Sequence, residues 1–410
     1  GIRDAQESRG LGDVYKRQGQ AGSSLAVKLK ALGFEGSVTL LGDEPVAPYQ
    51  RPPLSKKYLL GEMALDRLYL RPPKFYAEQG IDLRLNTSVD AINVKKKTVR
   101  IGNETLSYKQ LAFTTGSTPR RLPAKIGGEL NSVFSVRSLA DVDAMQSAFN
   151  KGGHVLIIGG GYIGLEAAAV AAAKGLKVTL VEMAKRILQR VACDETSNYF
   201  RDLHQNRGVK ILEGIGLEQL TGEGHVNGAI LSNGKTLDID FAIVGVGVMP
   251  GTALAEAAGL VQNNGIETDS WGRTSAPNIW AAGDCASFPF QGKQIRLESV
   301  PNAIDQAEVV ACNMLGAEQG YKATPWFWSD QYDVKLQIAG LNVGYTDVVV
   351  RDGNTARSHW YYKSDKLLAV DAMNDPRAYM VAKRLIEAGK TADPKIVADP
   401  QSELKELLRG

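Results

Sequence analysis

The alternation of apolar and polar positions divides the chain into recognisable elements. The clearest is residues 154–182, where an apolar strand, a glycine turn, an alanine-rich helix and a second apolar strand form a complete βαβ unit. A second unit of this kind begins at Gly19, where an amphipathic helix is followed by the strand SVTLLGDE. We therefore expect two βαβ units of the nucleotide-binding type, one beginning near residue 19 and one near residue 155. The two units repeat a function and are not copies of a short sequence repeat.

Shorter elements are predicted around these two units. We expect a short helix within 49–60, strands near 81–89, 97–101 and 104–107, a buried strand in 111–120, a strand and a helix in 133–150, a helix over Ala253–Ala258, a strand over Gly265–Thr268, a buried strand in 279–286 and a helix from near Pro301. From about 326 the pattern changes to alternating strands, closed by helices near 376–388 and 402–408. This change indicates a separate α+β C-terminal domain.

The first 18 residues do not fit this pattern. They are mixed polar residues with neither a helical nor a strand period. A helix that enters on a glycine turn normally follows a buried apolar strand, and we expect that strand to be absent or badly degraded here. We interpret residues 1–18 as non-native sequence; the alternative is a genuine, divergent N-terminal segment.

Composition narrows the class of protein. The 410 residues are too many for one compact core. A net charge of +3 gives no argument for nucleic-acid binding, and no apolar run reaches the roughly 18 residues of a membrane span. The three cysteines, Cys193, Cys285 and Cys312, lie far apart in the sequence. Their spacing argues against a disulfide framework, a cysteine zinc site and a redox-active dithiol, so we expect no metal and a cytoplasmic protein.

The strongest motif is Gly159-x-Gly161-x-x-Gly164 after the apolar strand Val155–Ile158. In such a motif the first glycine allows a tight turn, the second lets the backbone approach a pyrophosphate, and the third lets the helix pack closely on the sheet. The N–H groups at the helix N-terminus then face the phosphates. We predict a dinucleotide site here.

Glu182 ends the second strand of this unit. A carboxylate at that position can accept hydrogen bonds from ribose hydroxyls and would repel a 2′-phosphate. The sequence therefore favours NADH over NADPH, although the nearby cations Lys185 and Arg186 weaken the argument slightly.

Two further segments point to a second nucleotide. When the first glycine motif is aligned with the second, its positions fall on Arg17, Gly19 and Gly22, so the tight turn lacks its glycine. Asp43 or Glu44, at the end of the next strand, is a candidate ribose ligand. The segment AAGDCA places Asp284 at the end of a buried strand, where it can accept from a ribityl or ribose hydroxyl; an ordinary turn aspartate is the alternative.

A resemblance to a known family rests on several long motifs together: PYQRPPLSKKYLLGE, TTGSTPR, GGGYIGLEAAA, GVGVMPGT, NIWAAGDCA, RLESVPNAIDQA and PWFWSDQYDVKLQIAG. From about Gly19 to the C-terminus the chain resembles the bacterial ferredoxin reductases related to putidaredoxin reductase, in the wider family that includes apoptosis-inducing factor. The resemblance implies an α/β fold of the glutathione-reductase type, with two Rossmann-type dinucleotide-binding domains and a C-terminal α+β domain. It implies FAD and NADH as cofactors.

The implied domains are an FAD-binding domain over 1–117 and 249–325, an NAD-binding domain over 118–248, and the C-terminal domain over 326–410. The implied cofactor-binding residues are Gly19, Ala21, Gly22, Asp43, Arg51, Lys56, Val89, Thr115, Gly116, Arg137, Gly159, Gly161, Ile163, Gly164, Glu182, Gly247, Gly283, Asp284, Val300 and Trp328. Trp328 would cover the flavin. The helix opened by Val300 would direct its N-terminus at the N1/O2 edge of the flavin and favour negative charge there.

The implied catalytic residues are Lys56, near the flavin N5, and Glu166, opposite it across the nicotinamide pocket. Such a pair would position the nicotinamide without supplying a proton, because hydride passes directly to the flavin. The resemblance implies a ferredoxin–NAD(+) reductase that passes single electrons to a [2Fe-2S] ferredoxin serving a cytochrome P450 or a Rieske-type oxygenase. The alternatives are a rubredoxin reductase, an NADH oxidase or a redox-responsive interaction protein. For the oligomeric state, a monomer and a weak dimer both stay open.

Overall fold

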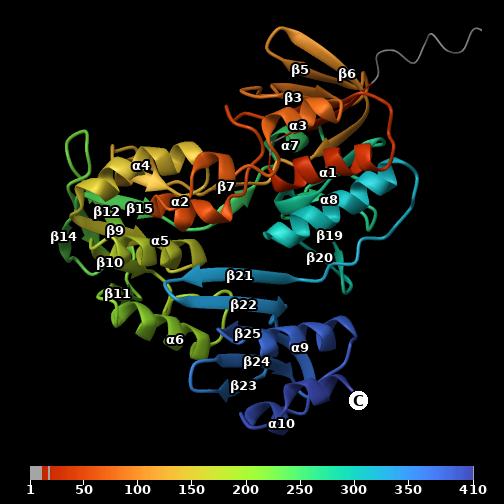
Figure 1. Ribbon diagram of the computed structural model, residues 1–410. Coiled ribbons are helices and arrows are strands. Elements are labelled where there is room, and N and C mark those ends of the chain that lie inside the picture. Colours follow the sequence, from red (N-terminus) through yellow and green to blue (C-terminus); the bar gives the residue numbers. More distant parts are fainter. Residues whose placement is uncertain (1–11, 17–18, 410) are drawn as a thin grey trace, which may run out of the picture. The chain divides into compact units, whose positions relative to one another are not determined.

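The structure, a computed structural model, describes residues 12–16 and 19–409 (Figure 1). Contacts divide the chain into two compact units. Unit 1 takes its described residues from 1–50, 65–118 and 249–323, and unit 2 consists of 51–64, 119–248 and the described part of 324–410. The segment 51–64 therefore belongs to unit 2 by its contacts, although its neighbours on both sides belong to unit 1.

Unit 1 contains a seven-stranded sheet in the order β3-β2-β1-β6-β5-β4, with β18 also paired to β6. Its strands are β1 (Gly12–Lys16), β2 (Val38–Leu41), β3 (Ile81–Arg84), β4 (Ala91–Asn93), β5 (Thr98–Ile101), β6 (Glu104–Phe113) and β18 (Ile279–Ala281). The strands expected separately at 104–107 and 111–120 are largely one long strand, β6. Its first half pairs antiparallel with β5 and its second half pairs parallel with β1 and β18.

The strand expected to be absent or badly degraded is present as β1, with the sequence GDVYK in place of an apolar run, so the expectation of an absent strand is wrong. It lies between β2 and β6 and pairs in parallel with both, so that Val14 is opposite Thr39 on one side and Leu111 on the other. Two neighbouring strands supply backbone partners along its length, and this tertiary pairing overrides a sequence that lacks an apolar run. Residues 1–11, Arg17 and Gln18 lie outside the described residues.

Helices α1 (Gln20–Ala31) and α8 (Val300–Met314) belong to the same apolar cluster of unit 1, which includes Leu25 and Leu29 of α1 and Val310 of α8. The N-terminus of α8 is capped by Ser299, whose hydroxyl accepts from the Asn302 N–H. The remaining elements of unit 1 are η2 (Leu65–Arg67), α3 (Pro73–Glu78), α7 (Ala253–Ala257), β17 (Ile266–Glu267), η4 (Gly283–Cys285), β19 (Ala286–Phe290) and β20 (Lys293–Ile295). Strands β7 (Ser117–Pro119) and β16 (Val248–Pro250) pair with each other.

Unit 2 contains the predicted βαβ unit as β9 (His154–Ile158), α5 (Tyr162–Ala173) and β10 (Lys177–Glu182), within a parallel sheet ordered β11-β10-β9-β15-β8. All five residues of β9 are buried. The other elements of this part are η1 (Pro52–Ser55), α2 (Lys57–Leu60), η3 (Ala124–Ile126), β8 (Val133–Ser135), α4 (Leu139–Lys151), α6 (Asp194–Gln205), β11 (Lys210–Glu213), β12 (Leu217–Thr221), β13 (Gly228–Leu231), β14 (Thr236–Asp238) and β15 (Phe241–Val244).

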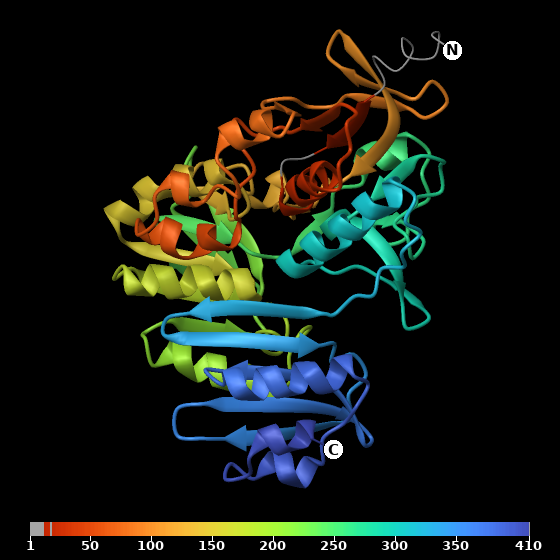
Figure 2. The ribbon, with the colours of Figure 1, turned by 45° about the vertical axis from the view of Figure 1, so that its right-hand side comes forward.

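The C-terminal part of unit 2 is an antiparallel sheet ordered β21-β22-β25-β24-β23, and β21 packs against α5 (Figures 1 and 2). Its elements are β21 (Trp326–Gln331), β22 (Val334–Gly340), β23 (Asp347–Asp352), β24 (Arg357–Lys363), β25 (Lys366–Met373), α9 (Pro376–Glu387), α10 (Pro394–Ala398) and η5 (Leu404–Leu408). The closing helix expected at 402–408 is a 3-10 turn, η5, and α10 was not expected. Both are five residues long, too short to show a helical period.

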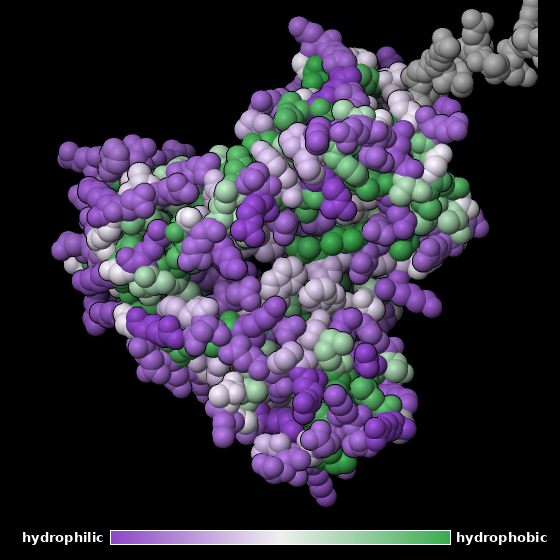
Figure 3. All heavy atoms as spheres, in the orientation of Figure 1, coloured by the Kyte–Doolittle hydropathy of each residue, from purple (hydrophilic) through white to green (hydrophobic). Residues whose placement is uncertain are grey.

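Hydrophilic residues cover much of the surface visible in Figure 3. Within the described residues, no helix is long and apolar enough to cross a membrane.

A buried polar cluster connects α6 to the C-terminal sheet. Thr196 of α6 donates to the Asp371 carboxylate over 2.7 Å, and the Tyr361 hydroxyl donates to the same oxygen. His359 Nδ1 lies 2.7 Å from the Thr196 hydroxyl. Thr196, His359 and Asp371 are each at most 1% exposed. Burial raises the pKa of Asp371 to about 6, and the hydrogen bonds from Tyr361 and Thr196 oppose that rise.

Replacing Asp371 by Asn should therefore change how stability depends on pH. A carboxyl whose pKa rises from 3.8 to about 6 on folding contributes stability that is complete below pH 3.8 and is lost as the pH rises through 6. Between pH 4 and 7 the parent protein should lose roughly 3 kcal/mol that Asp371→Asn does not lose. Urea unfolding followed by circular dichroism measures this difference. As a control, replacing the exposed Asp365 by Asn should leave the pH dependence of the free energy of unfolding the same as in the parent. If Asp371→Asn also showed the same pH dependence as the parent, the raised pKa of Asp371 would be contradicted.

Candidate active site

The turn between β9 and α5 has the geometry that its three glycines predicted. Gly159 has φ +107°, and a Cβ there would lie 2.5 Å from the Gly245 carbonyl oxygen. A Cβ on Gly164 would lie 2.1 Å from the Gly159 oxygen, whereas a Cβ on Gly161 would meet nothing within 4 Å. Close packing therefore requires glycine at Gly159 and Gly164, and open space remains at Gly161, the N-cap of α5. This arrangement fits a pyrophosphate at the helix N-terminus.

Glu182 lies at the end of β10 and holds the same turn from the side. Its Oε2 accepts from the Gly160 N–H over 2.7 Å, and its Oε1 accepts from the Ala184 N–H over 2.8 Å. A carboxylate oxygen has lone pairs left after one such bond, so a ribose hydroxyl can still bind. Glu182 therefore shapes the turn in addition to its predicted contact with the ribose.

Arg186 is not directed at a 2′-phosphate. Its guanidinium pairs with Asp194 at 2.5 Å, donates to the Ser197 hydroxyl and donates to the Ala192 carbonyl over 2.9 Å. These bonds attach it to the start of α6. The slight argument for NADPH that its position in the sequence suggested is therefore removed.

The loop after β15 borders the glycine turn, because Gly245 is the residue that Gly159 approaches. Gly247, in this loop, has φ +96°, and a Cβ there would lie 3.6 Å from an Arg190 guanidinium nitrogen. Ile163, in the first turn of α5, is 41% exposed. Arg190 was not predicted as a site residue, and nothing in the sequence pattern distinguishes it from other surface arginines.

Lys56 and Glu166 form an ion pair inside unit 2, with 3.0 Å between Nζ and Oε1. Glu166 is on α5, two residues after Gly164, and is only 5% exposed. Lys56 lies between η1 and α2, where the chain has left helical geometry. The carboxylate also accepts from the Ser55 hydroxyl over 2.6 Å and from the Ser329 hydroxyl over 2.7 Å. These three donors offset much of the cost of removing the carboxylate from water.

Sequence reasoning missed Ser55 and Ser329. Ser55 precedes Lys56 in QRPPLSKKYL, and Ser329 lies in WFWSDQ, so each was within a recognised motif. A serine in a strand or a turn carries no periodic signal. Only the position of Glu166, 111 residues from Ser55 and 163 from Ser329, gives the two hydroxyls a role.

Aromatic side chains lie beside the start of α5. The rings of Tyr162 and Phe327 are 5.0 Å apart, and those of Trp326 and Trp328 are 5.6 Å apart. Arg51, at the start of η1, donates to the Arg137 carbonyl over 2.7 Å. Four of the residues predicted to contact FAD belong to unit 2, namely Arg51, Lys56, Arg137 and Trp328.

The other residues predicted to contact FAD belong to unit 1. A Cβ on Gly283, at φ +78°, would lie 3.0 Å from the Ala21 Cβ, and the Gly283 N–H donates to Gln306 of α8. Asp284 accepts from the Ser117 hydroxyl over 2.9 Å. The structure thus brings the α1 N-terminus (Gly19, Ala21 and Gly22), the Gly283–Asp284 turn and the beginning of α8 at Val300 together.

The rest of the predicted set in unit 1 is less closely grouped. The Thr115 hydroxyl donates to the Gly251 carbonyl. Gly116, which follows Thr115 in the chain, has φ +61°. Val89 packs in an apolar cluster with Phe113 and Cys285. Asp43 is exposed just after β2, and neighbouring Glu44 accepts from the Tyr49 hydroxyl over 2.6 Å. With open space at Gly19 and tight packing at Gly283, unit 1 fits a dinucleotide at the N-terminus of α1.

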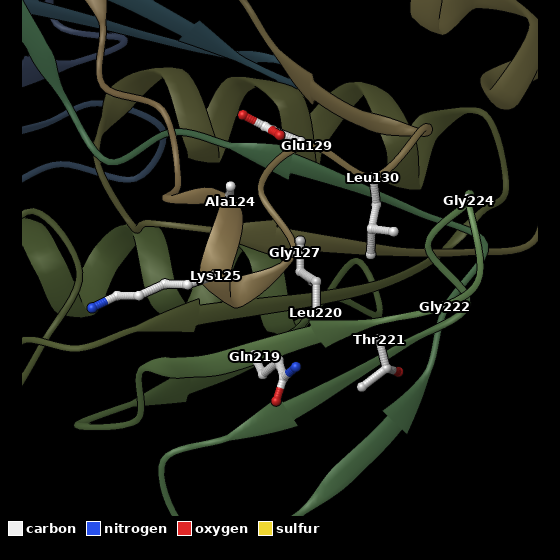
Figure 4. A pocket seen from close by; sticks show the side chains of 10 residues that line it. All are labelled: Ala124, Lys125, Gly127, Glu129, Leu130, Gln219, Leu220, Thr221, Gly222 and Gly224. Carbon is white, nitrogen blue, oxygen red and sulfur yellow. The ribbon is translucent and has the colours of Figure 1, made fainter.

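A separate hollow of about 450 Å³ lies between η3 and β12 of unit 2 (Figure 4). Lys125 and Glu129 are its charged lining residues, and Ala124, Leu130 and Leu220 are its apolar ones. The charged groups do not converge on one point in Figure 4, and we assign no chemistry to this hollow.

Comparisons with known proteins agree with this geometry. Residues 18–307 match the family described as pyridine nucleotide-disulphide oxidoreductase, and residues 326–408 match the domain described as reductase C-terminal. The chain belongs to the pyridine nucleotide-disulphide oxidoreductase family. The predicted fold class, with two Rossmann-type domains and a C-terminal domain, is confirmed, as is an oxidoreductase that uses FAD and NAD(H).

Within that family the chain is similar to ferredoxin reductases. It is 39% identical to putidaredoxin reductase CamA of Pseudomonas putida over 401 residues, which cover 95% of each chain. It is 39% identical over 398 residues to the 5,5′-dehydrodivanillate O-demethylase ferredoxin reductase subunit of Sphingobium sp., covering 95% of this chain and 96% of the relative. The reductase in the covalent putidaredoxin reductase–putidaredoxin complex superimposes with a TM-score of 0.93 at 37% identity, covering 97% of this chain and 98% of the other.

Glu182→Ala should raise the KM for NADH and shift the preference toward NADPH, because the variant loses the ribose acceptor and the repulsion of a 2′-phosphate. A change of roughly tenfold in the ratio of kcat/KM values corresponds to about 1.4 kcal/mol. Glu182→Gln keeps an acceptor for the turn and should shift the preference with a smaller rise in KM. Steady-state rates with both cofactors measure this, and Arg186→Met is the control that should leave the ratio unchanged. An unchanged ratio in both Glu182 variants would assign the preference to another residue.

Proposed function

We propose that this protein takes hydride from NADH onto FAD and delivers the electrons singly to a [2Fe-2S] ferredoxin that serves a cytochrome P450 or a Rieske-type oxygenase. The observation that carries the proposal is the ion pair between the half-buried Lys56 and the buried Glu166, which lies two residues beyond a glycine turn shaped for a dinucleotide. Similarity to ferredoxin reductases over 95% of the chain supports it. When bound, FAD supplies the step from a two-electron donor to a one-electron acceptor.

The residues of this chain bind and orient. Gly159, Gly161 and Gly164 admit the NADH pyrophosphate, and Glu182 holds the ribose. Lys56 and Glu166 orient the nicotinamide and transfer no proton. The FAD contacts are the predicted ones in units 1 and 2, with the FAD-binding domain over 1–117 and 249–325, the NAD-binding domain over 118–248 and the C-terminal domain over 326–410.

The state of the cysteines favours direct electron transfer from the flavin to the acceptor over electron transfer through a pair of cysteine thiols. Cys193 and Cys285 are at most 1% exposed, and burial raises the pKa of each thiol. A raised pKa disfavours the thiolate that exchange reactions require. Three isolated thiols also suit a reducing compartment, and we propose the cytoplasm.

Lys56→Met and Glu166→Ala should each slow flavin reduction by NADH more than they change FAD content. The pair orients the nicotinamide, and a misplacement of ~1 Å can cost roughly 10²-fold in rate. Because the two charges act as partners in a poorly solvated position, the double variant should be little slower than either single one. Anaerobic stopped-flow bleaching of the flavin band measures the rates. Rates like those of the parent in both single variants would show that the pair is structural.

The electron acceptor can be identified by turnover. Exposed cations at Arg67, Arg71 and Lys74 on unit 1 suit an acidic partner, so reduction of a [2Fe-2S] ferredoxin should be fast and should slow as salt rises. We expect NADH-dependent reduction of a [2Fe-2S] ferredoxin at least ~10-fold faster than that of rubredoxin or oxygen, since a preference of about 1.4 kcal/mol for one partner gives a factor of ten. Faster rubredoxin reduction would reassign the partner. Slow turnover with every acceptor would favour an interaction protein.

A further inference from the structure

A line of buried side chains in unit 2 leads from α6 to the Glu166 carboxylate. Ser329 donates to Glu166 Oε1 over 2.7 Å, and the Gln331 amide nitrogen donates to the Ser329 oxygen over 3.2 Å. His204 Nε2, in the last turn of α6, lies 2.8 Å from the Gln331 amide oxygen. Ser329, Gln331 and His204 are fully buried. No water is needed to complete the connection.

The direction of every bond in this line is determined. The Gln331 amide nitrogen donates to Ser329, so its oxygen must accept from His204. His204 therefore carries its proton on Nε2 and has a lone pair on Nδ1. That lone pair accepts from the Tyr332 hydroxyl over 3.2 Å. All four donors point toward the carboxylate, and bonds aligned in this way polarise one another.

The outer end of the line reaches the surface of unit 2. Tyr332 is half-buried in the turn between β21 and β22, and the Arg207 guanidinium lies 4.8 Å from the centre of its ring. Arg207 in turn pairs with Asp333 at 2.6 Å. The line therefore connects an exposed ion pair to a buried carboxylate through one histidine.

We propose that His204 is a positioning residue for Glu166, acting through Gln331 and Ser329 to fix the carboxylate against Lys56. This inference rests on the proposed role of Glu166 in orienting the nicotinamide. Without His204, the amide oxygen of Gln331 loses the only hydrogen bond that it accepts among the described residues. The Gln331 amide is then no longer held in place to donate to Ser329, and this is the bond that keeps the Ser329 hydroxyl directed at Glu166. Burial lowers the pKa of His204 to about 4, so the neutral ring that the line requires is the form present at neutral pH.

The test compares two replacements at His204. In His204→Gln the amide nitrogen can occupy the position of Nε2 and donate to Gln331, whereas His204→Leu fills the space without a donor. We expect His204→Leu to lower the limiting rate of flavin reduction by NADH roughly tenfold in anaerobic stopped flow, with little change in the Kd for NADH or in FAD content. His204→Gln should recover most of that rate. Oxidation of the reduced protein by a [2Fe-2S] ferredoxin should be unchanged in both.

His154 provides a matched control, since it is also a buried histidine of unit 2 with two hydrogen bonds, to the Asp238 carbonyl and the Thr179 hydroxyl. His154→Leu should lower thermal stability and leave the limiting rate unchanged. Ser329→Ala tests the same line with the loss of a single oxygen, and should slow the rate as His204→Leu does. If His204→Leu does not fold, a parental rate in Ser329→Ala still overturns the inference, because the line reaches Glu166 through Ser329.

Two outcomes separate this inference from the proposed function. If Glu166→Ala slows flavin reduction but His204→Leu and Ser329→Ala do not, the positioning role is wrong and the role of Glu166 stands. If His204→Leu slows the reaction as much in a Glu166→Ala background as in the parent, His204 acts independently of Glu166, and the inference is again overturned. A parental rate in Glu166→Ala itself would overturn the proposed function of the pair.

Discussion

The Glu166 carboxylate has to be satisfied inside unit 2, and much of the arrangement of this unit follows from that need. A buried carboxylate without partners costs several kcal/mol. Its donors come from two distant segments: Ser55 and Lys56 from residues 51–64, and Ser329 from β21. These bonds connect the short segment 51–64 and β21 to α5, and the elements of 51–64 also contact α4. The glycine turn and the ion pair are consequently held in one body.

Helix α6 shows how the two predicted parts of unit 2 are joined. Near its first turn, Thr196 binds Asp371 and His359 of the C-terminal sheet, and at its last turn His204 binds Gln331. Both connections are buried and polar. Polar contacts of this kind are directional, so they specify one register of the helix against the sheet, whereas an apolar interface would tolerate small shifts. Residues 119–248, part of the segment that matches the first family model, therefore belong to the same compact unit as the segment that matches the second.

The sequence predicted the structure correctly where the interactions that determine a segment lie within that segment. The unit 154–182 was predicted correctly because β9 is buried on both faces and the steric needs of Gly159 and Gly164 are local. Strand β1 was not, because its place is set by β2 and β6 rather than by its own polarity. Lys56 and Glu166 could be named through recognised motifs. Ser329 and His204 could not, since their roles exist only through partners far away in the sequence.

The spacing of these partners has a consequence for how the protein is made. Ser55 leaves the ribosome 111 residues before Glu166, and Ser329 follows Glu166 by 163 residues. At roughly 5–20 residues per second, synthesis of the 163 residues between Glu166 and Ser329 takes on the order of ten to thirty seconds. During that time the nascent chain holds a carboxylate whose last donor has not been translated. Unit 2 can therefore complete its interior only late in translation, and a chain truncated before β21 would expose an unfinished site to chaperones and proteases.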